Sequence, residues 1–251
     1  MTKENLPVWM SLDVSTECIG ITILVEDGSK YGKIAELTHI SLKVDKKIKG
    51  IESLFLKKQQ FQKFIKSFSE YSIDRVVIEE PLLSSNNQNT VATLLRFNGM
   101  ISDCIYNELG ITPTYISSYN ARAYAFPELM AIRKYGKDEN IYNQKKIIKN
   151  INSSNFVLFG SYPWTIDKKT VLHEKVKNIF PEIPWIYNKN GELRKENFDA
   201  VDSYVACIGQ INMEKYGPLE IKAENIQINK NKVDYDVLYW DMKEHRTTYL
   251  V

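Results

Sequence analysis

Four acidic residues stand where a fold could bring their carboxylates together. Asp13 ends the stretch VWMSLD, Glu79 ends the apolar run VVIE, and Asp199 and Asp202 open the stretch DAVDSYVACIG, three residues apart. Sites in open α/β sheets form outside the strand ends, and residues three apart on a helix share one face. Because four carboxylates in one crevice repel one another, the pattern predicts that cations join them.

Magnesium is the cation that this set of side chains favours. It is a hard ion that prefers oxygen ligands and needs neither histidine nor cysteine. Two such ions, about 3.5 to 4 Å apart, can activate a water and stabilise the attacking and departing oxygens of a phosphodiester. The acids therefore predict a two-metal nuclease site for Mg²⁺, for which Mn²⁺ would substitute. Taken singly, each acid also fits a structural role, as a turn former or as a first-turn helix residue.

Glu80 competes with Glu79 for a place in this crevice. Successive side chains on a strand face opposite ways, so only one of the pair can enter directly. The apolar alternation of the strand favours Glu79, and an assisting role for Glu80 stays open.

Composition sets the broad class of the protein. The chain has 251 residues, of which 43% are hydrophobic, enough for one large domain or two small ones. No stretch reaches the roughly eighteen apolar residues of a membrane span, and the start lacks the features of a signal peptide, so we expect a cytoplasmic protein. Cys18, Cys104 and Cys207 are far apart, which argues against disulfides and a zinc site and predicts buried thiols.

Basic residues gather in two stretches although the net charge is only +2. They outnumber acids between residues 120 and 180, and a second group precedes or opens a predicted helix: Lys46, Lys47, Lys49, Lys57 and Lys58. Such clusters are more often a solvated face than a phosphate-binding surface until a site is found beside them.

Hydrophobic periodicity predicts alternating strands and helices. Strands are expected at Val8–Asp13, from Gly20, at Ile34–Val44, Arg75–Pro81 and Thr112–Ser117, and helices at Gly50–Ser69, Thr90–Leu109, Lys168–Ile179 and from Asn197. This order indicates a mixed α/β sheet with helices packed on it. Residues 120–166 break the rhythm and are interpreted as an insertion or long loop within a single domain, 1–251. Residues 212–251 form a predicted C-terminal extension with one strand at Val233–Met242.

Several segments resemble the motifs of the RuvC-type Holliday junction resolvases, nucleases of the ribonuclease H-like fold. They are LDVSTECIG from Leu12, IEEPLLSSNNQNTVATLLRFNG from Ile78, DKKTVLHEKV from Asp167 and DAVDSYVACIG from Asp199. The resemblance covers roughly residues 8–126 and 167–210, and its motifs are fairly specific only in combination. It implies a mixed five-stranded sheet flanked by helices.

The resemblance also assigns roles to residues. It implies that Asp13, Glu79, Asp199 and Asp202 are the metal ligands and that Lys168 is the active-site lysine. The expected DNA-binding residues are Leu82, Leu83, Asn86, Lys168, Lys169 and His173. The two leucines stand where relatives often place an aromatic wedge, which suggests plain apolar insertion into an opened junction.

The activity implied is Mg²⁺-dependent cleavage of four-way or other branched DNA by a homodimer assembled through the helix Thr90–Leu109. A resolvase rich in lysine and asparagine, with extra segments, would suit a virus or phage working in a host cytoplasm. The alternatives are a fork, flap or RNA–DNA hybrid nuclease of the same fold and a non-catalytic junction-binding protein. An actin-like sugar kinase has a similar first loop but needs a second phosphate motif, which the chain lacks.

Overall fold

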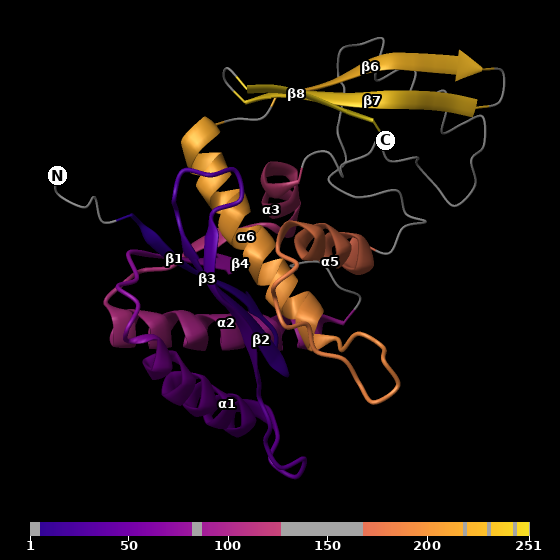
Figure 1. The fold of residues 1–251 in the computed structure, drawn as a ribbon. Helices are drawn as coiled ribbons and strands as arrows, with labels where there is room; N and C mark the ends of the chain where they lie inside the picture. The colour runs from indigo at the N-terminus through magenta and orange to yellow at the C-terminus, as the bar shows by residue number, and fades with distance from the viewer. Residues whose placement is uncertain are drawn as a thin grey trace, which may run out of the picture.

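The computed structural model describes residues 6–81, 87–126 and 168–217, except for the side chain of Lys168, together with the strand assignments within 220–250 (Figure 1). Five strands form the central sheet: β1 (Val8–Val14), β2 (Cys18–Val25), β3 (Lys33–Ser41), β4 (Arg75–Glu79) and β5 (Thr114–Ile116). Their order is β3-β2-β1-β4-β5, in which β1, β2 and β3 are antiparallel and β4 and β5 continue parallel to β1. The predicted mixed five-stranded sheet is confirmed.

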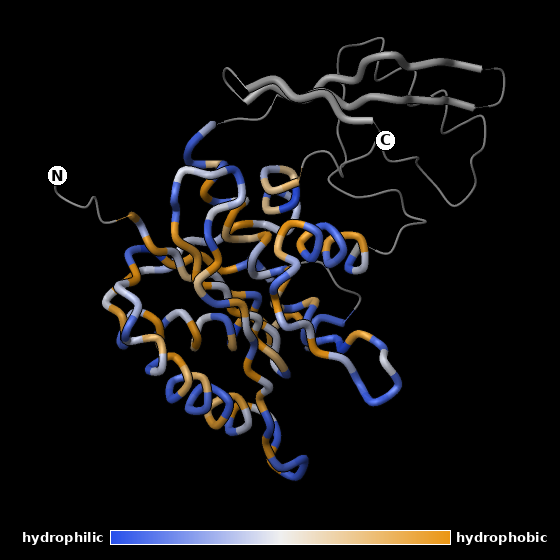
Figure 2. The backbone as a smooth tube through the Cα atoms, in the orientation of Figure 1, coloured by the Kyte–Doolittle hydropathy of each residue, from blue (hydrophilic) through white to orange (hydrophobic). Residues whose placement is uncertain are grey.

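Helices cover both faces of this sheet. On one face lie α1 (Gly50–Ile65), which continues into the short 3-10 helix η1 (Lys66–Phe68), and α2 (Gln88–Leu109). On the other lie α3 (Ser118–Ala125), α5 (Lys168–Ile179) and α6 (Glu196–Tyr216). The predicted helices over 50–69, 90–109, 168–179 and from 197 are therefore all present. Figure 2 shows both hydrophobic and hydrophilic residues along α1, as expected of an amphipathic helix with one face on the sheet.

Successive side chains on β1 and β4 face opposite sides of the sheet and so divide the core into two layers. Met10 and Leu12 pack with α1 and α2, whereas Trp9 packs with α3, α5 and α6. On β4, Ile78 belongs to the first layer and Val77 to the second. Residues that follow the parity of Trp9 and Val77 therefore point toward α6.

Two predicted boundaries were wrong. Residues 120–125, expected to open a loop or insertion, form most of α3, because Ala121 and Ala125 are buried in the core layer that contains α6. Residues 127–166 lie outside the described part of the chain. The predicted extension from 212 begins inside α6, which runs to Tyr216 and is tied to α3 by the Asn212 side-chain amide donating to the carbonyl oxygen of Tyr124 at 3.0 Å.

The tail contains a second sheet. Strands β6 (Glu220–Asn229), β7 (Lys232–Met242) and β8 (His245–Leu250) pair antiparallel in that order. The predicted strand at Val233–Met242 is β7, and its two partners were not predicted.

All three cysteines are free and buried, as expected. Among the described residues, no helix combines the length and the apolar character needed to cross a membrane.

Candidate carboxylate site

Asp13 and Glu79 end neighbouring parallel strands at the same edge of the sheet. Leu12 pairs with Ile78 across β1 and β4, so each acid follows one member of this pair. Both acids share the parity of Trp9 and Val77 and so face α6. Two carboxylates are thus placed side by side under the helix.

A glycine lets α6 approach the strand next to them. Gly20 on β2 pairs with Asp13, and a Cβ atom at Gly20 would overlap the carbonyl oxygen of Asp199 and lie 2.7 Å from the backbone nitrogen of Ala200. Only a residue without a side chain fits here. The start of α6, and with it Asp199, is therefore brought down beside Asp13.

A buried hydrogen bond fixes the rotation of α6 about its axis. The hydroxyl groups of Thr22 on β2 and Ser203 on α6 lie 2.8 Å apart, and the Ser203 hydroxyl also donates to the carbonyl oxygen of Ala200 at 2.7 Å. Asp202 adjoins Ser203 and is buried, with 7% of its surface exposed. Its carboxylate is consequently held in the interior.

Electrostatics show that the acids of the strands and of α6 form one cluster. Burial raises the pKa of Asp13 well above its ordinary value, and the charges of Glu79, Asp202 and Asp199 raise it further. Burial and then the charge of Asp202 raise the pKa of Glu79 from 4.5 to about 8, against the opposing charges of Arg122 and Lys169. Burial also raises the pKa of Asp202. Such shifts are expected where like charges share a desolvated site.

Among the described side chains, Lys169 is the lysine that reaches this cluster. Its Nζ lies 3.8 Å from Oδ1 of Asp199 and 3.5 Å from Oδ2 of Asp202. Burial lowers the pKa of Lys169, but the charges of Asp202, Asp199 and Asp13 outweigh that effect, so its pKa is raised. The expected active-site lysine, Lys168, begins α5 and its side chain is outside the described ones, so its role stays a prediction.

Arg122 is a second cation at the cluster, and no site role was predicted for it. Its charge lowers the pKa of both Glu79 and Asp202, against the larger effect of burial. It comes from α3, which lies close on α6 because Gly209 has no side chain. A Cβ atom at Gly209 would stand 2.5 Å from the carbonyl oxygen of Ala121. A usable sequence signal existed: α3 follows β5, a strand parallel to β1 and β4, so its first turns begin at the same sheet edge as the acids.

His173 does not lie where a DNA-contacting residue would. Only 1% of its surface is exposed, and its ring packs edge-on against Trp185 and Phe198, with centroids 4.5 and 6.0 Å away. It shares a buried helix face with Leu172 and Val176, which explains its burial. The expectation that His173 binds DNA directly is contradicted.

The remaining predicted residues divide into two groups. Leu82, Leu83 and Asn86 lie outside the described residues. Glu80 is exposed, and its backbone N–H donates to the carbonyl oxygen of Ile116 at 2.8 Å. Glu79 rather than Glu80 thus belongs to the cluster.

The donor set suits magnesium. Its acidic side chains offer only oxygen atoms, and because the pKa values of Asp13, Glu79 and Asp202 are raised, a bound cation would favour their ionised forms. No three acidic, histidine or cysteine side chains in the described segments are spaced to hold one ion by themselves. This is compatible with Mg²⁺, which commonly takes one or two carboxylates and completes its shell with water and substrate phosphate.

Comparison with known proteins identifies the fold. No protein-family model and no curated protein sequence matches the chain. Among solved structures, Thermus thermophilus RuvC in complex with Holliday junction substrate superposes with a TM-score of 0.51 at 7% identity, covering 84% of this chain and 96% of that one. T. thermophilus RuvC alone gives 0.48 at 10% identity over 84% and 96%, and the yeast mitochondrial Holliday junction resolvase Ydc2 gives 0.46 at 11% over 85% and 84%. The chain therefore has the fold of RuvC, a ribonuclease H-like mixed sheet flanked by helices.

Proposed function

We propose that this chain is a metal-dependent, structure-selective endonuclease that cleaves four-way or other branched DNA. The observation that carries the proposal is the convergence of Asp13, Glu79, Asp199 and Asp202 at one edge of the sheet, with Lys169 beside them. The fold supports it, since the RuvC structure that superposes on this chain holds a Holliday junction substrate.

The carboxylates would hold the metal. Asp13 and Glu79 come from a rigid sheet, and Asp199 and Asp202 from a helix packed directly upon it, so the ligands would be preorganised. When bound, a pair of Mg²⁺ ions supplies water activation and charge neutralisation for phosphodiester hydrolysis.

The two cations of the cluster would act on the substrate. The ammonium of Lys169 and the guanidinium of Arg122 lie beside the acids, where an anionic phosphodiester would enter. Preorganised positive groups at such a place stabilise the negative charge that develops in phosphoryl transfer. Lys169 would steady the scissile phosphate, and Arg122 would orient it.

A homodimer would allow two matched cuts in a four-way junction. On α2, Leu95, Gly99 and Tyr106 form an exposed stripe at helical spacing. A Cβ atom at Gly99 would meet no atom of the chain within 4 Å, so this stretch of helix surface is open to a partner. We place the dimer contact there, as the resemblance implies.

The test is cleavage of synthetic DNA. Purified protein is incubated with a four-way junction, a fork, a flap, a linear duplex and an RNA–DNA hybrid, each with Mg²⁺ or with a chelator. We expect paired incisions in the junction that require Mg²⁺. Preferential cutting of the fork, flap or hybrid would favour the alternative nucleases of the same fold, whereas junction binding without any Mg²⁺-dependent cutting would favour a non-catalytic protein.

A further inference from the structure

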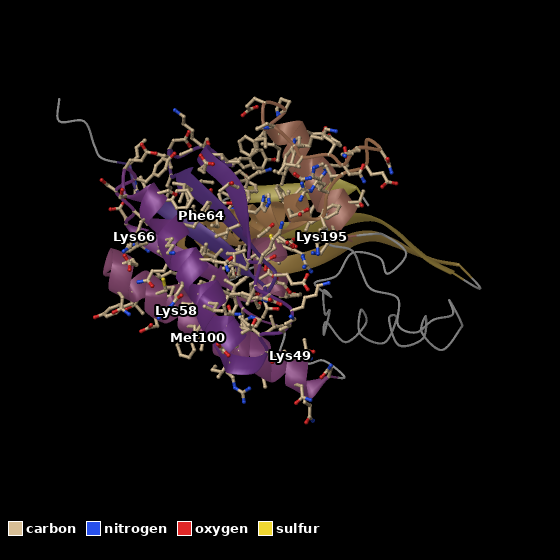
Figure 3. All side chains as sticks on the ribbon, turned by 90° about the horizontal axis from the view of Figure 1, so that it is seen from below. Lys49, Lys58, Phe64, Lys66, Met100 and Lys195 are labelled. Carbon is tan, nitrogen blue, oxygen red and sulfur yellow. The ribbon has the colours of Figure 1, made fainter. Side chains whose placement is uncertain are left out.

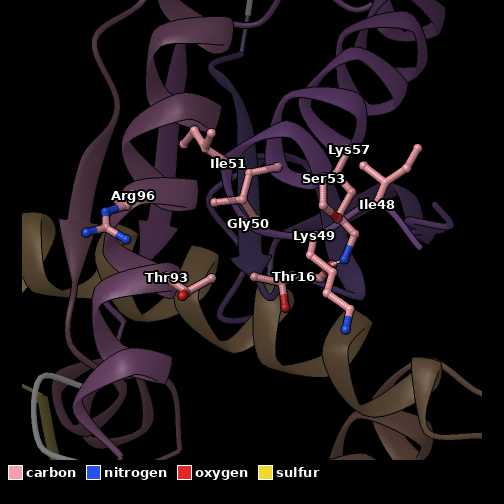
Figure 4. A pocket seen from close by; sticks show the side chains of 10 residues that line it. Thr16, Ile48, Lys49, Gly50, Ile51, Ser53, Lys57, Thr93 and Arg96 are labelled. Atoms are coloured by element: carbon pink, nitrogen blue, oxygen red, sulfur yellow. Dashed lines mark hydrogen bonds between the residues drawn. The ribbon is translucent and has the colours of Figure 1, made fainter. Parts of the chain in front are cut away.

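A pocket outside the carboxylate cluster is lined by cations, and no acid is among the described residues that line it. It is a cavity of about 550 Å³ between the start of α1, the first half of α2 and the turn that follows β1 (Figure 4). The residues that line it are Thr16, Ile48, Lys49, Gly50, Ile51, Ser53, Leu54, Lys57, Thr93 and Arg96. Three positive side chains and three hydroxyl groups therefore surround one opening.

The cations come from different elements and are held apart. Lys57 donates from Nζ to the carbonyl oxygen of Thr16 at 2.6 Å, which fixes its ammonium against the β1–β2 turn. Figure 4 shows Arg96 on the α2 side of the pocket and Lys49 on the opposite side, with the hydroxyl groups of Thr16 and Thr93 in the space between them. Lys49 and Arg96 are exposed, so both remain accessible to a partner.

The pocket is continuous with the approach to the acids. An adjoining cavity of about 590 Å³ shares Ile48, Ser53 and Lys57 with it and extends to Cys18. Its other charged lining residues are both basic and acidic: Lys43, Lys46, Lys195, Glu17, Asp45 and Glu196. Cys18 lies beside the cluster, since burial and then the Asp199 carboxylate raise the pKa of its thiol. Figure 3 shows that Lys49 stands at the end of α1 nearer to Lys195, whereas Lys66 lies at the other end.

We propose that this pocket binds the sugar-phosphate backbone of a DNA strand that runs to the carboxylate cluster. The inference rests on the proposed function and adds to it a second contact for the same substrate. The three cations and three hydroxyl groups among its described lining residues match phosphate oxygens. None of the described residues that line the pocket has an aromatic ring on which a base could stack. Binding at this place is thus independent of base sequence.

The salt dependence of DNA binding tests the proposal. Fluorescence anisotropy with a labelled four-way junction, in chelator to prevent cutting, gives the association constant between about 50 and 200 mM salt. Lys49→Ala and Arg96→Ala should each weaken binding and make the slope of log K against log salt shallower by about 0.9, and the double variant by about 1.8. Lys57 is left intact because it also supports the β1–β2 turn.

Matched variants separate the pocket from general surface charge. Lys63→Ala also removes one positive charge, from the exposed far part of α1 outside the pocket. Its slope of log K against log salt should be steeper than that of Lys49→Ala. Lys49→Arg should restore the parent slope because it keeps the charge. At saturating DNA in Mg²⁺, single-turnover cleavage by Lys63→Ala should match the parent, since Lys63 belongs neither to the pocket nor to the carboxylate cluster.

The outcomes distinguish the two proposals. If Lys49→Ala and Arg96→Ala bind with the same slope as Lys63→Ala, the pocket is not a phosphate site, whatever the parent cleaves. If the variants show the predicted slope changes but the parent cleaves no DNA, the proposal of a phosphate-binding pocket holds and the nuclease proposal fails.

Discussion

Gly20 on β2 lies directly against the peptide carbonyl of Asp199 on α6. This contact holds the two halves of the carboxylate cluster together, because Gly20 is also the strand partner of Asp13. The helix can supply its acids only if the strand leaves room for its backbone.

Gly20→Ala should therefore damage both stability and activity. The added methyl group would meet backbone atoms that cannot turn aside, so α6 must shift, and overpacking of this kind costs about 1 to 3 kcal/mol. Denaturant unfolding and junction cleavage measure the two effects. Gly99→Ala is the control for stability only, because Gly99 belongs to the proposed dimer contact. Its methyl group would meet no other part of the chain within 4 Å, and an alanine within a helix is expected to stabilise by about 0.5 to 1 kcal/mol. Equal stability of the two variants would show that α6 does not need the glycine.

Glu79→Gln should abolish cleavage, while Glu80→Gln should leave it nearly unchanged. Both substitutions remove one negative charge from neighbouring positions, but only Glu79 belongs to the cluster and Glu80 is exposed. The loss of cleavage rate in Glu79→Gln should exceed the roughly 10- to 100-fold loss that is typical when a residue behind a metal ligand is replaced. Single-turnover rates on a four-way junction provide the comparison. Parent-like cutting by Glu79→Gln would remove this residue from the metal site.

The metal-free protein should lose stability as the pH rises from about 4.5 to 8. The folded pKa of Glu79 is raised from 4.5 to about 8, so in this window the folded state binds more protons than the unfolded state. The slope of unfolding free energy against pH is then negative, and the raised pKa values of Asp13 and Asp202 act in the same direction. Urea unfolding in chelator at several pH values measures this, and Glu79→Gln should flatten the decline. A stability that rises through this window in the parent would contradict the clustering of the acids.

Lys169→Ala should slow cleavage more than Lys168→Ala if the contacts of Lys169 with Asp199 and Asp202 reflect its role. Removal of the ammonium leaves the acids without their nearest cation and the scissile phosphate without a positive neighbour. Rapid-quench measurements at saturating DNA isolate the chemical step from binding. A slow Lys168→Ala beside a parent-like Lys169→Ala would favour the sequence-based assignment instead.

Much of this site could be predicted because its determinants are local. The parity of β4 alone separates Glu79 from Glu80, and three-residue spacing places Asp199 and Asp202 on one face of α6. These rules depend on strand and helix geometry, which the apolar pattern reveals.

The positions that the sequence alone does not settle depend on tertiary packing. Lys168 and Lys169 are adjacent at a helix start, and which of them reaches the acids depends on how α5 is rotated by its buried residues Leu172 and Val176. Arg122 lies in a stretch whose small, aromatic and polar residues show no clear apolar period, so the sequence did not predict a helix there. The alanines of this helix are buried because another helix packs closely against it. His173 was expected to bind DNA because it matches the histidine of a resolvase motif, although its neighbours Trp185 and Phe198 place it in the core.

The contact between Gly209 and Ala121 joins α3 to α6 without room for sliding. The helices α3 and α6 consequently form one rigid block, which carries Asp199, Asp202 and Arg122. The sheet forms another, which carries Asp13 and Glu79. Any tilt of that block would change the binding of the cation and of the phosphate at the same time. A substitution at Gly209, although remote from the acids, should therefore affect both.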